Sequence, residues 1–141
     1  MASKRRGFVL IAMSVTMLLL LAMMGLAFDV GRIYIARNEA QVFCDAAAMA
    51  AASKLDGTQA GLDRAREAAL RLPMRWNLGT REFRNVRVEF DSKDPAGVTM
   101  VRVTAPDNSV EIAFLRAVGG PKSFTVPAHA AAAAHPVRLV E

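Results

Sequence analysis

A run of 22 residues without a charged side chain, residues 7–28, limits what this chain can fold into more than any other feature. At about 1.5 Å rise per residue, a helix of this length covers roughly the 30 Å hydrocarbon core of a bilayer. Residues 4–6 are all basic, and Asp29 follows the run. Basic residues favour the cytoplasmic side of a span, so we expect residues 1–6 in the cytoplasm. The sequence therefore predicts a single-pass membrane protein with its bulk on the outer side.

A cleaved secretory signal is the alternative interpretation of the same run. Such a signal has an apolar core of about 7 to 15 residues followed by small residues at the cleavage site. Gly25 and Ala27 offer small residues, but the apolar run is longer than a signal needs. If it were cleaved, the chain would be a small secreted ligand-binding module or enzyme.

No proline interrupts the chain between the span and Leu55, so we expect one helix from about residue 8 to residue 55, ended by the turn-forming residues 56–61. Residues 29–55 would be the extramembrane continuation of the span. An apolar stripe recurs there at alternating steps of three and four. Its members are Ile33, Ala36, Ala40, Phe43, Ala47 and Ala50. Because most of them are small, they permit close approach of a second helix or of the protein's own head domain.

Polar residues recur in the same way on the opposite side of this helix. They are Tyr34, Asn38, Gln41 and Asp45. The spacing of Gln41 and Asp45 permits an i,i+4 hydrogen bond, and that of Asp29 and Arg32 permits an i,i+3 ion pair. Asp45 either faces water or fastens the helix to the head.

Residues 56–141 are predicted to form a small α+β domain outside the membrane. Residues 62–72 have the spacing of a short amphipathic helix. Apolar residues then alternate, as they do in half-buried strands. They are Val86, Val88 and Phe90; Val101, Val103 and Ala105; and Val110, Ile112 and Phe114. A further strand within residues 122–134 is weakly indicated, because its alanines favour helix. The predicted fold is thus α+β, a long N-terminal helix with an antiparallel sheet of three to four strands and one short packing helix.

Catalytic and metal-binding patterns are scarce in this sequence. His129 and His135 are six residues apart, which matches neither an i,i+4 pair nor the usual zinc spacings. Cys44 is the only cysteine, so it cannot form an internal disulfide, and its alanine neighbours favour a buried position. Of the net charge of +5, residues 4–6 supply +3, leaving 15 basic against 13 acidic residues. We expect no enzymatic activity, no cofactor, no metal and no nucleic-acid partner.

Two regions carry a family pattern. The first is a basic stub, an apolar span, D-x-G-R-x-Y, a polar stretch ending in Gln, and an aspartate followed by alanines. Its positions are Asp29, Gly31, Arg32, Tyr34, Gln41, Asp45 and the alanines between Ala46 and Ala52. The second is a V-x-V-T run and an alanine-rich tail within residues 101–134. Together they resemble the TadE-like and TadG-like proteins of the Flp (Tad) pilus assembly system.

The resemblance implies a single-pass protein of the bacterial inner membrane that acts in pilus assembly, adhesion or secretion without enzymatic activity. Its partners would be other pilus-assembly or pilin-like membrane proteins, or itself. Prepilin-like members are cut after a glycine and carry Glu at the fifth mature position, whereas Ala12 stands there if Gly7 is the cut site. We therefore expect a retained anchor. The candidate interaction or structural residues are Asp29, Arg32, Tyr34, Ala36, Asn38, Ala40, Gln41, Phe43, Asp45 and Ala47.

Overall fold

The structure is a computed structural model that describes residues 3–72, 83, 85–91, 99–105 and 108–134. Its elements, in chain order, are α1 (Ser3–Ala52), α2 (Gln59–Leu70), β1 (Arg87–Asp91), β2 (Thr99–Ala105), β3 (Ser109–Glu111), α3 (Phe114–Ala117), β4 (Ser123–Thr125) and β5 (Ala128–Ala134). The predicted α+β class, with a long N-terminal helix, a short helix and small antiparallel sheets, is confirmed.

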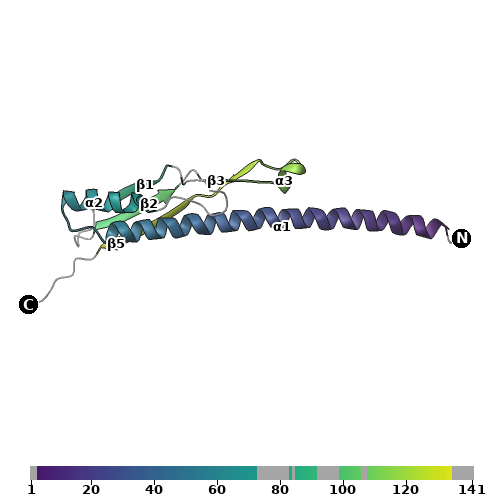
Figure 1. Ribbon diagram of the computed structural model, residues 1–141, viewed down its shortest axis with the longest axis horizontal. Helices are drawn as coiled ribbons and strands as arrows, with labels where there is room; N and C mark the ends of the chain where they lie inside the picture. The colour runs from purple at the N-terminus through teal and green to yellow at the C-terminus, as the bar shows by residue number, and fades with distance from the viewer. Residues whose placement is uncertain (1–2, 73–82, 84, 92–98, 106–107, 135–141) are drawn as a thin grey trace, which may run out of the picture.

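Helix α1 is one uninterrupted rod of 50 residues, about 75 Å long. Figure 1 shows its N-terminal part extending well beyond the rest of the protein. Among the residues that the structure describes, it is the one helix long and apolar enough to cross a membrane. The hydroxyl groups of Ser14 and Thr16 donate to the carbonyl oxygens of Leu10 and Ala12, at 2.9 Å each, which satisfies these donors inside the apolar run.

Local polar contacts after α1 start α2. Asp56 accepts hydrogen bonds from the backbone N–H and the hydroxyl group of Thr58, at 3.0 and 2.6 Å. The Thr58 hydroxyl in turn accepts from the Gly61 N–H at 3.0 Å, so Thr58 is the N-cap of α2. Arg64 pairs with the other oxygen of Asp56. The predicted turn thus lies between the two helices, but α1 ends at Ala52, before the expected residue 55, and α2 already begins at Gln59, because Thr58 caps it there.

The main sheet has three antiparallel strands in the order β1-β2-β5, with β2 in the centre. Its inward-facing residues are directly paired, Val88 with Val103 and Val103 with Ala130. Helix α1 packs against β2 and β5, and α2 lies beside α1 and also contacts β1 (Figure 1). The alternate residues of the strands, such as Arg102 and His129, are exposed on the other face. The head is thus a two-layer structure with one open sheet face.

Two parts of the predicted sheet are different in the structure. The strand expected to include Ile112 and Phe114 ends at Glu111, and Phe114 begins α3. Strand β3 does not join the main sheet but pairs with β4 as a separate ribbon. The place beside β2 is taken by β5, so the alanine run is a strand. Packing against α1 outweighs the helix propensity of alanine here.

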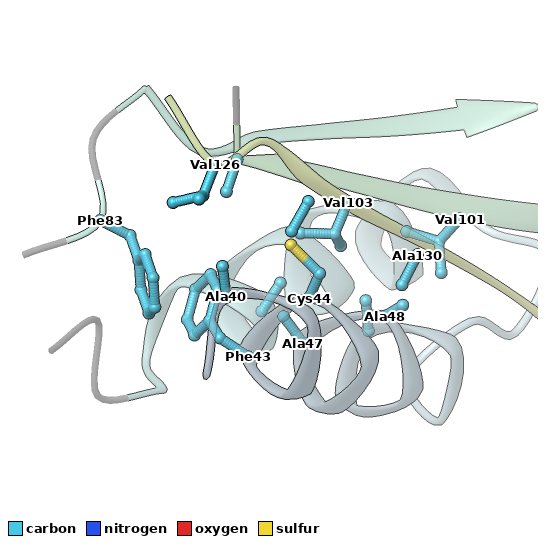
Figure 2. Packing of buried hydrophobic residues seen from close by; sticks show 14 of the residues in the cluster. Ala40, Phe43, Cys44, Ala47, Ala48, Phe83, Val101, Val103, Val126 and Ala130 are labelled. Atoms are coloured by element: carbon cyan, nitrogen blue, oxygen red, sulfur yellow. The ribbon is translucent and has the colours of Figure 1, made fainter. Parts of the chain in front are cut away.

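The core between α1 and the sheet is built mostly from small side chains. Figure 2 shows Cys44 and its alanine neighbours on α1 facing Val103 and Ala130 of the sheet. At one end, the ring of Phe43 stacks on that of Phe83, with 4.7 Å between ring centroids. Small residues on both layers allow the helix and strand backbones to lie close together, which leucines would prevent.

Candidate functional site

The ten candidate residues all lie in the C-terminal half of α1, and they have different surroundings in the structure. Four of them, Ala36, Ala40, Phe43 and Ala47, are buried in the core. Ile33 and Ala50 of the predicted stripe are half-buried. The stripe therefore packs against the protein's own sheet. Of the two occupants that the sequence allowed, the head domain takes this face.

The polar stripe lies at the margin of that interface. Tyr34, Asn38 and Asp45 are exposed, and Gln41 is half-buried. The Gln41 side-chain amide donates to Asp45 Oδ1 at 3.0 Å and to the backbone carbonyl oxygen of His129 in β5 at 3.1 Å. Asp45 thus faces water and orients Gln41, and it is Gln41 that binds the sheet directly.

Asp29 has surroundings that its sequence position does not suggest. Its side chain is fully buried. Oδ1 accepts from the backbone N–H of Ala113 at 3.0 Å, and Oδ2 accepts from the N–H groups of Phe114 and Leu115 at 2.8 and 2.7 Å. One carboxylate on α1 therefore binds three consecutive N–H groups at the start of α3.

These hydrogen bonds determine the ionisation of Asp29. Burial favours the neutral carboxyl group, but the three backbone donors and the nearby charge of Arg32 together outweigh it and hold the pKa of Asp29 below its usual value. The carboxylate is therefore the form that holds α3. The sequence pointed to Arg32 as the partner of Asp29, whereas most of the contact comes from backbone groups more than 80 residues further along the chain.

Aromatic and small residues surround this carboxylate contact. A Cβ atom at Gly25 would lie 2.8 Å from the Phe114 side chain, so only glycine leaves room for it. The Phe28 and Phe114 rings meet edge to face, with centroids 5.6 Å apart. The Arg32 guanidinium lies 5.9 Å from the centre of the Phe28 ring. Glycine one turn before Asp29 was the only signal in the sequence for this contact.

A third set of α1 residues was not singled out from the sequence. Ile35, Val42 and Met49 are exposed by 44%, 60% and 63% of their surface, and they are spaced by seven residues. Phe28 and Leu21 continue this spacing into the apolar run and are exposed as well. We call Ile35, Val42 and Met49 the outer face of α1. A seven-residue spacing places these side chains in one line along the helix, which is one of the two apolar positions of a coiled-coil repeat, while the other position carries the polar residues Asn38 and Asp45. The spacing itself was present in the sequence.

The remaining reactive groups offer little chemistry. Burial, and to a lesser degree the neighbouring charge of Asp45, raise the pKa of the Cys44 thiol to about 11, against the opposing effect of a backbone hydrogen bond from Ala105. Cys44 is therefore a core residue in its neutral form. His129 is exposed on β5, and His135 lies outside the described residues. No group of three His, Cys, Asp or Glu side chains able to hold a metal occurs in the part of the chain that the structure describes.

Comparison with known proteins agrees with the resemblance seen in the sequence. Residues 7–54 match the model of a family described as Putative Flp pilus-assembly TadE/G-like. No curated protein and no solved structure matches the chain. The matched segment covers nearly all of α1 and includes Asp29, the apolar stripe and the outer face. Together with the apolar α1, it indicates a membrane protein related to pilus assembly. Residues 7–54 are thus similar to the TadE/G-like family, the family that the sequence resembles.

Proposed function

We propose that the protein is a non-enzymatic component of Flp/Tad-type pilus assembly or surface attachment, and that it acts through helix packing and protein contacts. In this proposal, residues 7–28 anchor it in the bacterial inner membrane, residues 1–6 lie in the cytoplasm, and residues 29–141 lie in the periplasm. The family match and the long apolar helix α1 support this. The observation that carries the proposal is the outer face of α1. It is an exposed apolar surface on the segment that matches the family, and the head domain does not cover it.

The partner that fits the outer face is another helix anchored in the same bilayer. Ile35, Val42 and Met49 continue the line of exposed apolar residues that begins in the span, so two neighbouring spans would bring their extensions side by side. Asp45 lies next to this line and is exposed. In a parallel, in-register pair of identical chains the two Asp45 carboxylates would face one another, which is unfavourable. We therefore propose a different pilus-assembly or pilin-like chain, with an amide or basic side chain opposite Asp45.

Complementation of a deletion strain tests this proposal. We expect deletion to abolish piliation or surface attachment and the unaltered gene to restore it. Val42→Arg places a charge in the middle of the outer face and should fail to restore function while the protein accumulates normally. The matched control is Ala131→Arg, on the open face of the sheet, where the side chain is also exposed. Normal piliation and attachment in the deletion strain, or equal complementation by Val42→Arg and Ala131→Arg, would contradict the proposal.

The alternative, a secreted module with a cleaved signal, is distinguished by the intact mass of the protein purified from membranes. A chain that begins at Met1 or Ala2 agrees with a retained anchor, and one that begins near Phe28 contradicts it. A start at Phe8 would indicate pilin-like processing despite Ala12. The packing of Phe114 on Gly25 supports retention, because cleavage after Ala27 would remove the residue on which Phe114 rests.

A further inference from the structure

We propose that the hairpin formed by β3, α3 and β4 is a second membrane contact, whose tip lies in the lipid interface beside the point where α1 leaves the bilayer. The inference rests on the proposed anchoring of residues 7–28, because the position of the span sets the depth of everything attached to it. Figure 1 shows the hairpin extending from the head along α1 toward the N-terminus, with α3 at its far end.

The contacts of α3 fix its depth relative to the span. Asp29 binds the first N–H groups of α3, and Phe114 lies directly on Gly25. Gly25 is three residues inside the end of the apolar run, which is about 4.5 Å along the helix. Segments that lie in a membrane interface have their apolar face about 5–10 Å into the boundary between headgroups and acyl chains. The hairpin tip is therefore held at interfacial depth by the helix itself.

The exposed side chains of the tip have the chemistry of an interfacial segment. Val118 is exposed by 77% and Phe114 by 49%, and Phe124, in the two-stranded part of the hairpin opposite Val110, is exposed by 51%. Residues 112–122 contain no acidic residue, and their two cations, Arg116 and Lys122, are exposed. Apolar and aromatic side chains next to basic ones suit a surface of acyl chains and anionic headgroups.

Backbone N–H groups on both sides of α3 are hydrogen-bonded within the protein. After α3, the N–H groups of Val118 and Gly120 both donate to the carbonyl oxygen of Leu115, at 3.2 and 2.8 Å, and the N–H of Gly119 donates to Arg116 at 3.2 Å. Before α3, Asp29 occupies the N–H groups of residues 113–115. Donors that are already paired can approach the acyl region without an unsatisfied polar group. The pairing of these donors therefore removes one cost of bringing the tip into contact with lipid.

A fluorescent label at Val118 tests the contact in the full-length protein. The label is an environment-sensitive NBD group on the thiol of Val118→Cys. Cys44 is the only native cysteine, and it is buried with a raised pKa, so labelling is specific in the folded chain. The protein is reconstituted into phosphatidylcholine and phosphatidylglycerol vesicles. We expect blue-shifted emission, quenched more by lipids with a nitroxide near the headgroup than by lipids with one deep in the chain. Ala133→Cys, exposed on the open sheet face, should show neither effect.

Flotation of the same vesicles separates this inference from the anchoring on which it rests. If the protein floats with the lipid but the label at Val118 behaves like that at Ala133, the interfacial contact is wrong and the anchor stands. A label that is shielded but not quenched by nitroxide lipids indicates a protein contact and also overturns the inference. Protein that does not float overturns both. As a second variant, Asp29→Asn should release the hairpin and lower the nitroxide quenching at Val118 at least twofold without affecting flotation, and unchanged quenching would contradict the role given to Asp29.

Discussion

The head is attached to α1 in two places by opposite kinds of chemistry. Between Ala36 and Ala51, small apolar side chains pack against β2 and β5 over several helical turns. At Asp29, one buried carboxylate binds three N–H groups of a separate hairpin. The first attachment is distributed and depends on shape, whereas the second is a single point that depends on charge and direction. Changes of side-chain volume should therefore disturb the first, and changes of charge the second.

The largest effect is expected from a larger side chain in the interface where the alanines of α1 pack against β2 and β5, which we call the alanine interface. Ala47→Leu adds three carbons where no surface is exposed, and such substitutions in a packed core typically cost about 1–3 kcal/mol. The free energy of unfolding can be measured by urea titration in detergent micelles. Val42→Leu, on the exposed outer face, is the control and should change it by less than about 0.5 kcal/mol. Equal stability of the two variants would mean that the helix and sheet are not closely packed.

A local effect is expected from Asp29→Asn, which keeps the shape of the side chain but removes its charge and one of its two acceptor oxygens. Amide hydrogen exchange at residues 113–115 should become faster by on the order of tenfold to a hundredfold, the range for losing a hydrogen bond to a charged group. Exchange in β2 and β5 should not change. Equal acceleration throughout the head would show that the two attachments are not separate.

The same contact should respond to acid in the unaltered protein. Because the pKa of Asp29 is lower in the folded state, its stabilisation of the hairpin is complete above the ordinary carboxyl pKa of about 3.9 and is lost as the pH falls through the folded-state value. Exchange at residues 113–115, corrected for its intrinsic pH dependence, should accelerate in acid in the unaltered protein but not in Asp29→Asn. A pH-independent difference between them would exclude the charge as the cause.

The alanine interface should respond to base through Cys44. The thiol ionises near its ordinary pKa of about 8.5 in the unfolded chain and at about 11 in the folded one, so stability is lost as the pH rises between these values. At about pH 10 the loss attributable to Cys44 should be about 1–2 kcal/mol. The measurement is the difference between the unaltered protein and Cys44→Ala across this range. Parallel stability curves would show that the thiol is not buried against the sheet.

The smallest effect is expected at the polar margin. Gln41→Ala removes the hydrogen bond to the His129 carbonyl oxygen, which is exposed to solvent, and should cost about 0.5–1.5 kcal/mol, the usual net contribution of one hydrogen bond. Asn38→Ala, one turn earlier and exposed, is the matched control and should have no measurable effect on unfolding. Asp45→Ala should cost less than Gln41→Ala, because Asp45 acts on the sheet only through Gln41. A larger loss for Asp45→Ala would reverse these roles.

The sequence determines α1 and its faces well, because the helical period of apolar residues is long and regular. Burial of Ala36, Ala40, Phe43 and Ala47 follows directly from that period. The strand β5 does not follow from its own residues, since alanine favours helix and only the close fit against α1 decides the matter. Strand β3 ends before Phe114, and Asp29 is buried, for one common reason. The Asp29 carboxylate binds backbone N–H groups of Ala113 and Phe114, more than 80 residues further along the chain. Apart from Gly25, one turn before Asp29, no local pattern reports such a contact.

The central claim is that α1 turns its alanine face to its own head and its outer face to a partner. The most direct test is cysteine crosslinking in cells that assemble pili, with Val42→Cys and Ala40→Cys as the pair of variants. Val42→Cys should form a crosslink to a second membrane-anchored chain, and Ala40→Cys, which has no exposed surface, should form none between chains. Intermolecular crosslinks from Ala40→Cys, with none from Val42→Cys, would contradict the account.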